Sequence, residues 1–127
     1  MKGIKVLLVD DEDELVSTLA ERLLIRGIEA DWATSAEGAL IKMSSNRYDI
    51  ALLDVKMPRI SGIELKKKME EKNPDMKFIF MTGHGSEADF YAGTAEAGSE
   101  YYLVKPVNIE DLISKMKDVI TFKRGQK

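Results

Sequence analysis

The chain has 127 residues, of which 44% are hydrophobic and 32% charged, the composition of one soluble globular domain. It contains no cysteine, which excludes a disulfide scaffold, a thiolate zinc site and a cysteine nucleophile. A net charge of −3 and short apolar runs argue against direct nucleic-acid binding and against a membrane protein. Because the N-terminal sequence does not resemble a signal peptide, we expect a cytoplasmic protein.

The first half of the chain alternates between strand and helix patterns. Residues Ile4 to Val9 are apolar almost throughout, which predicts a strand buried on both faces. After this strand, leucines recur every fourth residue until Gly27, which predicts an amphipathic helix that ends at the glycine. Residues Ile28 to Ala33 alternate weakly as a second strand. Ser35 is the predicted cap of a second helix, which ends near residues 44–46.

The second half repeats this alternation. Strands are predicted at Ile50–Leu53, Lys77–Met81 and Tyr101–Val104. Helices are predicted at Ile63–Lys72, at about Glu87–Ala97, and from a cap at Asn108 to the polar end Lys123–Lys127. Gly93 makes the middle one of these helices the weakest of the fold.

Five strand-then-helix units with short connections predict an all-parallel sheet, because each right-handed crossover places its helix against the sheet. The expected fold class is therefore α/β, a doubly wound five-stranded parallel sheet with helices on both faces. We find no internal repeat and no linker, so residues 1–127 are expected to form one domain. In such sheets, ligands bind at the carboxyl ends of the strands.

The residues that directly follow the predicted strands are polar. Asp10 and Asp11 follow the first strand, Asp54 the third, Thr82 the fourth and Lys105 the fifth. Three carboxylates this close together would repel one another unless a cation lies among them. Mg²⁺ suits the arrangement, since it takes a few carboxylate oxygens and is completed by water and phosphate oxygens. With a lysine and a hydroxyl alongside, these groups predict a pocket for a phosphoryl group.

Some of these residues also have simpler interpretations. Glu12, Asp13 and Glu14 continue the acidic run, and we interpret them as the solvated first turn of a helix, favoured by the helix dipole. Lys105 taken alone would be an ordinary surface lysine, and only its coincidence with the aspartates favours the pocket. His84, the only histidine, excludes a multi-histidine metal site and is interpreted as a solvent-exposed loop residue.

Several separated motifs occur in a recognisable order. They are Val9-Asp10-Asp11, Leu53-Asp54 with Met57-Pro58 and Gly62, Met81-Thr82-Gly83-His84-Gly85, and Tyr102-Leu103-Val104-Lys105-Pro106. The pattern resembles the receiver domain of two-component response regulators, which has a flavodoxin-like fold. The resemblance covers essentially the whole chain, and several motifs in the right order are far more specific than any one of them.

The resemblance implies a role for each site residue. Asp54 would be the phosphoacceptor, taking a phosphoryl group from a phosphohistidine on a sensor histidine kinase or phosphotransfer protein. Asp10 and Asp11 would hold Mg²⁺ together with Asp54 and the backbone carbonyl of Lys56. Lys105 would pair with the phosphoryl oxygens.

Further features implied by the resemblance concern switching. Thr82 would hydrogen-bond another phosphoryl oxygen, and Tyr102 matches the aromatic switch of the family. The side chains of Lys56 and His84 would tune the lifetime of the phosphoryl group, and the Lys105–Pro106 peptide would be cis. The face formed by the fourth helix, fifth strand and fifth helix would mediate homodimerisation. The chain stops after the fifth helix, so we expect no output domain within it.

Two alternatives compete with the phosphorylation-controlled signalling switch. One is a magnesium-dependent phosphohydrolase with an aspartyl-phosphate intermediate, which would use the same carboxylates. It would also need a general acid and a substrate pocket, and no second acidic residue lies close after Asp54. The other is a degenerate receiver that only binds a partner, which is disfavoured because every phosphorylation position is filled. We therefore expect a switch and not an enzyme.

Overall fold

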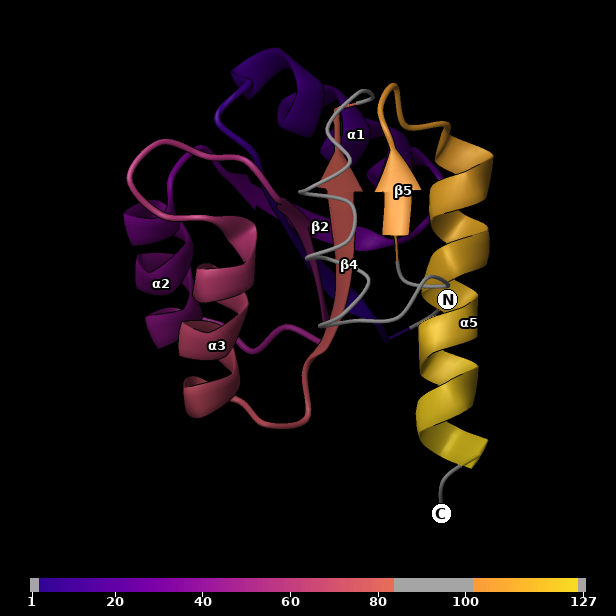
Figure 1. Ribbon diagram of the computed structural model, residues 1–127. Coiled ribbons are helices and arrows are strands. Elements are labelled where there is room, and N and C mark those ends of the chain that lie inside the picture. Colours follow the sequence, from indigo (N-terminus) through magenta and orange to yellow (C-terminus); the bar gives the residue numbers. More distant parts are fainter. Residues whose placement is uncertain (1–2, 84–101, 126–127) are drawn as a thin grey trace.

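The computed structural model describes residues 3–83 and 102–125, with side chains described as far as residue 120. Its strands form one five-stranded parallel sheet in the order β2-β1-β3-β4-β5 (Figure 1). The strands are β1 (Lys5–Val9), β2 (Glu29–Ala33), β3 (Ile50–Asp54), β4 (Lys77–Thr82) and β5 (Tyr102–Val104). The most apolar strands, β1, β3 and β4, occupy the interior of the sheet, where both faces are buried.

The helices of the described residues cover both faces of the sheet. They are α1 (Asp13–Ile25), α2 (Ala36–Ser45), α3 (Gly62–Lys72) and α5 (Ile109–Gly125). In Figure 1, α2 and α3 lie side by side on one face and α5 lies on the other. Within this part of the chain, no helix is both long enough and apolar enough to cross a lipid bilayer.

Two apolar clusters hold these layers together, because successive side chains of a strand point to opposite faces. The cluster that joins the sheet to α1 and α5 includes Val6, Leu8, Val16, Leu23, Leu52, Ile79, Leu112 and Met116. The cluster on the face covered by α2 and α3 includes Leu7, Val9, Ala39, Leu53, Leu65, Met69, Phe80 and Tyr102. The doubly wound parallel fold predicted from the sequence is confirmed.

The local signals at the helix ends agree with the predictions. The Ser35 side chain accepts a hydrogen bond from the Gly38 N–H at 3.0 Å and caps α2. Asn108 Oδ1 accepts from the N–H groups of Glu110 and Asp111 at 2.8 and 3.2 Å, which caps α5. Gly27 follows α1 with a φ of +79°, a conformation that glycine adopts without strain.

Several boundaries differ from the predictions, most of them by one residue: β1 begins at Lys5, β3 ends at Asp54 and β4 ends at Thr82. The C-terminal helix continues to Gly125, although the polar composition predicted an end before Lys123. Polar residues can extend a helix in this way, because their N–H groups bond to carbonyl groups within the helix. Strand β5 begins at Tyr102, and Tyr101 lies outside the described residues. So do His84 and the predicted helix at 87–97 with Gly93.

Candidate functional site

The register of the sheet brings the polar residues to one edge. Val9 lies beside Leu53, so Asp10 and Asp54 follow at the same level of neighbouring strands. Thr82 pairs with Val104 across β4 and β5, and the N–H of the next residue, Lys105, donates to the Thr82 carbonyl at 2.8 Å. Residues separated by up to about a hundred positions therefore meet at the carboxyl ends of β1, β3, β4 and β5.

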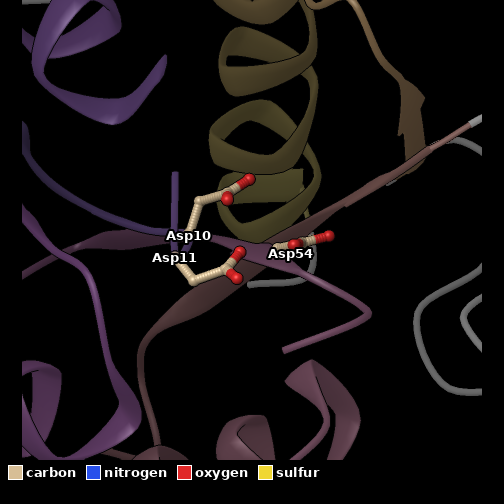
Figure 2. Close-up of side chains that lie close together, drawn as sticks. All are labelled: Asp10, Asp11 and Asp54. Carbon is tan, nitrogen blue, oxygen red and sulfur yellow. The ribbon is translucent and has the colours of Figure 1, made fainter. Parts of the chain in front are cut away.

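Three carboxylates form the centre of this site. Oxygen atoms of Asp10, Asp11 and Asp54 all lie within 4.8 Å of one another, and Figure 2 shows the three side chains gathered where β1 and β3 end. Asp10 is fully buried and Asp54 is 4% exposed, whereas Asp11 is exposed to solvent. The site thus combines two buried carboxylates with a third on its open side.

Lys105 supplies positive charge to the cluster. Its Nζ lies 2.6 Å from Asp10 Oδ2 and 3.4 Å from Asp54 Oδ2, so it bridges the two buried carboxylates. It also lies 3.2 Å from Glu12 Oε1. The sequence interpretation placed Glu12 only in a solvated helix start, and the structure adds this contact across 93 positions, for which the local pattern gives no signal.

Backbone groups fix the orientation of both buried aspartates. The Glu12 N–H donates to Asp10 Oδ1 at 2.9 Å, and the Lys56 N–H approaches Asp54 Oδ1 at 3.4 Å. After Asp54, the loop returns so closely that a β-carbon on Gly62 would overlap the Asp54 carbonyl oxygen. Only glycine fits this approach, which gives a physical reason for Gly62 in the motif that follows Asp54.

The other predicted residues lie around this centre. Thr82 is buried, and its hydroxyl donates to the Gly83 carbonyl at 3.1 Å, so the structure does not place it in contact with the carboxylates. Tyr102 is 7% exposed, with its ring centroid 6.4 Å from that of Phe80. The side chain of Lys56 is exposed. The Lys105–Pro106 peptide is cis.

The acidic centre shifts the pKa values of its members. Burial raises the pKa of the Asp54 carboxyl to about 6, and the charge of Asp10 adds to this effect. Burial also raises the pKa of Asp10. For Lys105, burial acts to lower the pKa, but the hydrogen bond and negative charge of Asp10 outweigh it, so that its pKa is raised and the amine stays protonated.

The raised pKa of Asp54 predicts a pH-dependent stability in metal-free buffer. The ordinary value is 3.8, so the folded protein binds this proton more tightly than the unfolded chain. The contribution of Asp54 to stability should therefore fall by about 2–3 kcal/mol as pH rises from about 4 to about 6 and change little above this range. Asp54→Asn should remove this contribution and be the more stable protein at pH 7. Urea denaturation with EDTA at several pH values measures the free energy of unfolding of the wild type and of Asp54→Asn. A difference between the two proteins that stays constant over all pH values would contradict this prediction.

The donor set suits a hard divalent cation. All three side chains offer carboxylate oxygens, and no soft sulfur or imidazole ligand is among them. Asp10 Oδ2 is buried without a hydrogen-bond donor in good geometry, and its close contact is the Lys105 ammonium group. A cation-binding site with a neighbouring lysine can neutralise a doubly charged anion such as a phosphoryl group.

The fold and site together define a doubly wound α/β protein with an acidic centre at the carboxyl edge of its sheet. Residues 6–117 match the family described as response regulator receiver domain. The chain belongs to this family of two-component signalling proteins, whose receiver domains are signalling switches.

Individual relatives agree with this membership. The response regulator MprA of Mycobacterium sp. (strain KMS) is 30% identical over 117 residues, which make up 92% of this chain and 50% of that protein. The chain thus spans about half the length of the curated relatives it matches. The crystal structure of a receiver domain protein from Clostridium thermocellum matches with a TM-score of 0.84 and 30% identity, over 98% of this chain and 99% of that chain.

A further similar structure contains a phosphorylated residue and a divalent cation. It is a response regulator protein from Burkholderia pseudomallei with a phosphorylated aspartic acid, calcium ion and citrate. It matches with a TM-score of 0.77 and 26% identity, over 88% of this chain and 65% of that chain.

Proposed function

We propose that this chain is a phosphorylation-controlled switch in which Asp54 accepts a phosphoryl group from a phosphohistidine on a sensor histidine kinase or phosphotransfer protein. The observation that carries the proposal is the buried carboxylate of Asp54 beside two further carboxylates and the Lys105 amine. The phosphorylated aspartic acid of the Burkholderia pseudomallei relative supports it. Phosphorylation by a small phosphodonor, compared between the wild type and Asp54→Asn, tests it.

The proposed reaction is a nucleophilic displacement at phosphorus. An ionised Asp54 oxygen attacks, the bond between phosphorus and the donor's imidazole nitrogen breaks, and the imidazole leaves with the electron pair and takes up a proton. Lys105 pairs with a phosphoryl oxygen as its contact with Asp54 loosens. Asp10, Asp11, Asp54 and the Lys56 carbonyl would hold Mg²⁺, which when bound would neutralise charge on the phosphoryl oxygens.

A switch explains the surroundings of Asp54 better than a hydrolase does. The three residues after Asp54 are Val55, Lys56 and Met57, so no carboxyl group stands there to protonate a leaving group. We therefore assign the chain as a phosphoacceptor and not as an enzyme that turns over small phosphate esters. Residues 1–127 as one receiver domain and a cytoplasmic location are parts of the same proposal.

The signal would leave the site through Thr82 and Tyr102. A phosphoryl oxygen would give the Thr82 hydroxyl a charge-assisted partner in place of the Gly83 carbonyl that it now contacts. The buried ring of Tyr102, on the neighbouring strand, would respond to movement of the loop after β4. Homodimerisation through the face that includes β5 and α5 would be one output of such a change.

Magnesium binding provides a separate prediction. Asp11→Ala should weaken Mg²⁺ binding by roughly ten-fold or more, because a hydrated cation loses one charged oxygen ligand. Asp13→Ala is the matched control, since Asp13 is exposed, lies two residues further on and does not belong to the carboxylate cluster. Isothermal titration calorimetry measures both affinities. Equal heats for wild type and Asp11→Ala would refute the assignment of Asp11 as a ligand.

A further inference from the structure

A cavity lies apart from the carboxylate cluster, between the start of α2, the loop after β3 and the middle of α3. Its volume is about 340 Å³. It is lined by Ser35, Ala36, Glu37, Leu40, Pro58, Arg59, Ile60 and Lys68. Ser35 also caps α2, and none of these side chains belongs to the carboxylate cluster or takes part in the proposed phosphotransfer.

The cavity has an apolar part and a charged part. Leu40, Pro58 and Ile60 supply apolar surface, and Leu40 and Ile60 are partly buried against the core. Arg59 and Lys68 are exposed cations, and in the described part of the chain no carboxylate lies within ion-pair distance of either. Glu37 is the single acidic residue of the lining. The lining thus carries a net positive charge on a protein whose net charge is −3.

The backbone at Arg59 is unusual for a residue with a long side chain. Its φ is +75°, and the Ile60 N–H donates to the Pro58 carbonyl at 2.8 Å. The three residues therefore form a γ-turn with a positive φ at its centre, which is the rarer and more strained of the two γ-turn types. Glycine would adopt this conformation freely, whereas an arginine there costs stability. What arginine contributes at this position is therefore its side chain, which lines the cavity.

We propose that this cavity is a docking site for an acidic peptide segment of a partner protein, with a carboxylate between Arg59 and Lys68 and an apolar side chain against Leu40 and Ile60. The two cations without described partners provide the charge complementarity. A volume near the lower end of the roughly 300–1,000 Å³ typical of small-ligand pockets suits one or two side chains of such a segment.

The test uses a fluorescein-labelled peptide with two aspartates flanking a leucine, and the same peptide with asparagines in place of the aspartates. Both are titrated into the ¹⁵N-labelled chain without Mg²⁺ or phosphodonor, so that the result does not depend on the phosphorylation of Asp54. The aspartate peptide should give saturable amide shifts at Glu37, Leu40 and Ile60. The asparagine peptide should not.

Variants separate a defined pocket from diffuse attraction to a basic helix. Arg59→Gly and Lys68→Ala should each weaken binding by about five- to ten-fold, and Glu37→Gln should strengthen it by about two- to three-fold. Arg59→Gly suits the positive φ, so the fold is expected to persist. Lys67→Ala is the matched control, because Lys67 is exposed on the same helix but does not line the cavity.

Three results would overturn the proposal. The first is the absence of saturable shifts with the aspartate peptide, and the second is equal binding of the two peptides. The third is a loss of affinity in Lys67→Ala as large as that in Lys68→Ala, which would show attraction to the charge of the helix and not to the cavity.

Discussion

Replacing Asp54 with asparagine will reduce phosphorylation by acetyl phosphate or phosphoramidate to below roughly 1% of the wild-type level, because the substitution removes the attacking oxygen anion. Asparagine has nearly the same shape, so the packing around this buried residue is preserved. Intact-mass spectrometry after incubation with Mg²⁺ and phosphodonor measures the fraction of protein that carries one added phosphoryl group.

Asp13→Asn is the control for this experiment. Asp13 is a carboxylate of the neighbouring helix start, but it is exposed and outside the cluster, so the variant should be phosphorylated like wild type. A mass increase that persists in Asp54→Asn would show that another residue is the acceptor. Urea denaturation confirms that both variants are folded before they are compared.

Lys105→Met will lower the free energy of unfolding at pH 7 by about 3 kcal/mol in metal-free buffer, because it leaves two buried carboxylates without their cation. Asp10 and Asp54 face each other across this lysine, whose side chain is only 18% exposed. Mg²⁺ should restore part of the loss, since a divalent cation can supply the missing positive charge. Chemical denaturation with and without Mg²⁺ measures both effects.

Two comparisons make the prediction for Lys105 specific. Arg47→Met removes a cation from an exposed ion pair with Asp75, 3.6 Å long, and should cost less than about 0.5 kcal/mol. Adding Asp54→Asn to Lys105→Met should recover stability, with a coupling of more than about 1 kcal/mol. If Lys105→Met destabilises the protein no more than Arg47→Met does, Lys105 is not the cation that holds the acidic centre together.

The centre of the site was predictable because it follows from topology. The predicted buried strands end at Val9 and Leu53, and the next residues are aspartates, so a parallel sheet brings Asp10 and Asp54 together whatever the rest of the chain does. Lys105 was predictable by the same reasoning from the fifth strand, although a single lysine carries little signal by itself. The fold class followed from the same alternation of strand and helix patterns.

Contacts that depend on three-dimensional packing were not predictable. The residues around Glu12 predict only a solvated helix start. Its contact with Lys105 forms only because β1 and β5 end at the same edge of the sheet. The close approach of Gly62 to the Asp54 carbonyl depends on the path of a seven-residue loop, for which the sequence gives only a glycine. The positive φ of Arg59 has no signal in the sequence, because arginine is rarely chosen for that conformation.

The identity of the phosphorylated residue tests the central claim most directly. The chain is treated with phosphoramidate and Mg²⁺, reduced with borohydride, which converts an aspartyl phosphate to homoserine, and digested for tandem mass spectrometry. Homoserine at position 54, absent when EDTA replaces Mg²⁺, is the predicted result. Homoserine at Asp10 or Asp11, or an unmodified Asp54 in protein that has gained a phosphoryl group, would contradict the assignment of Asp54 as the acceptor.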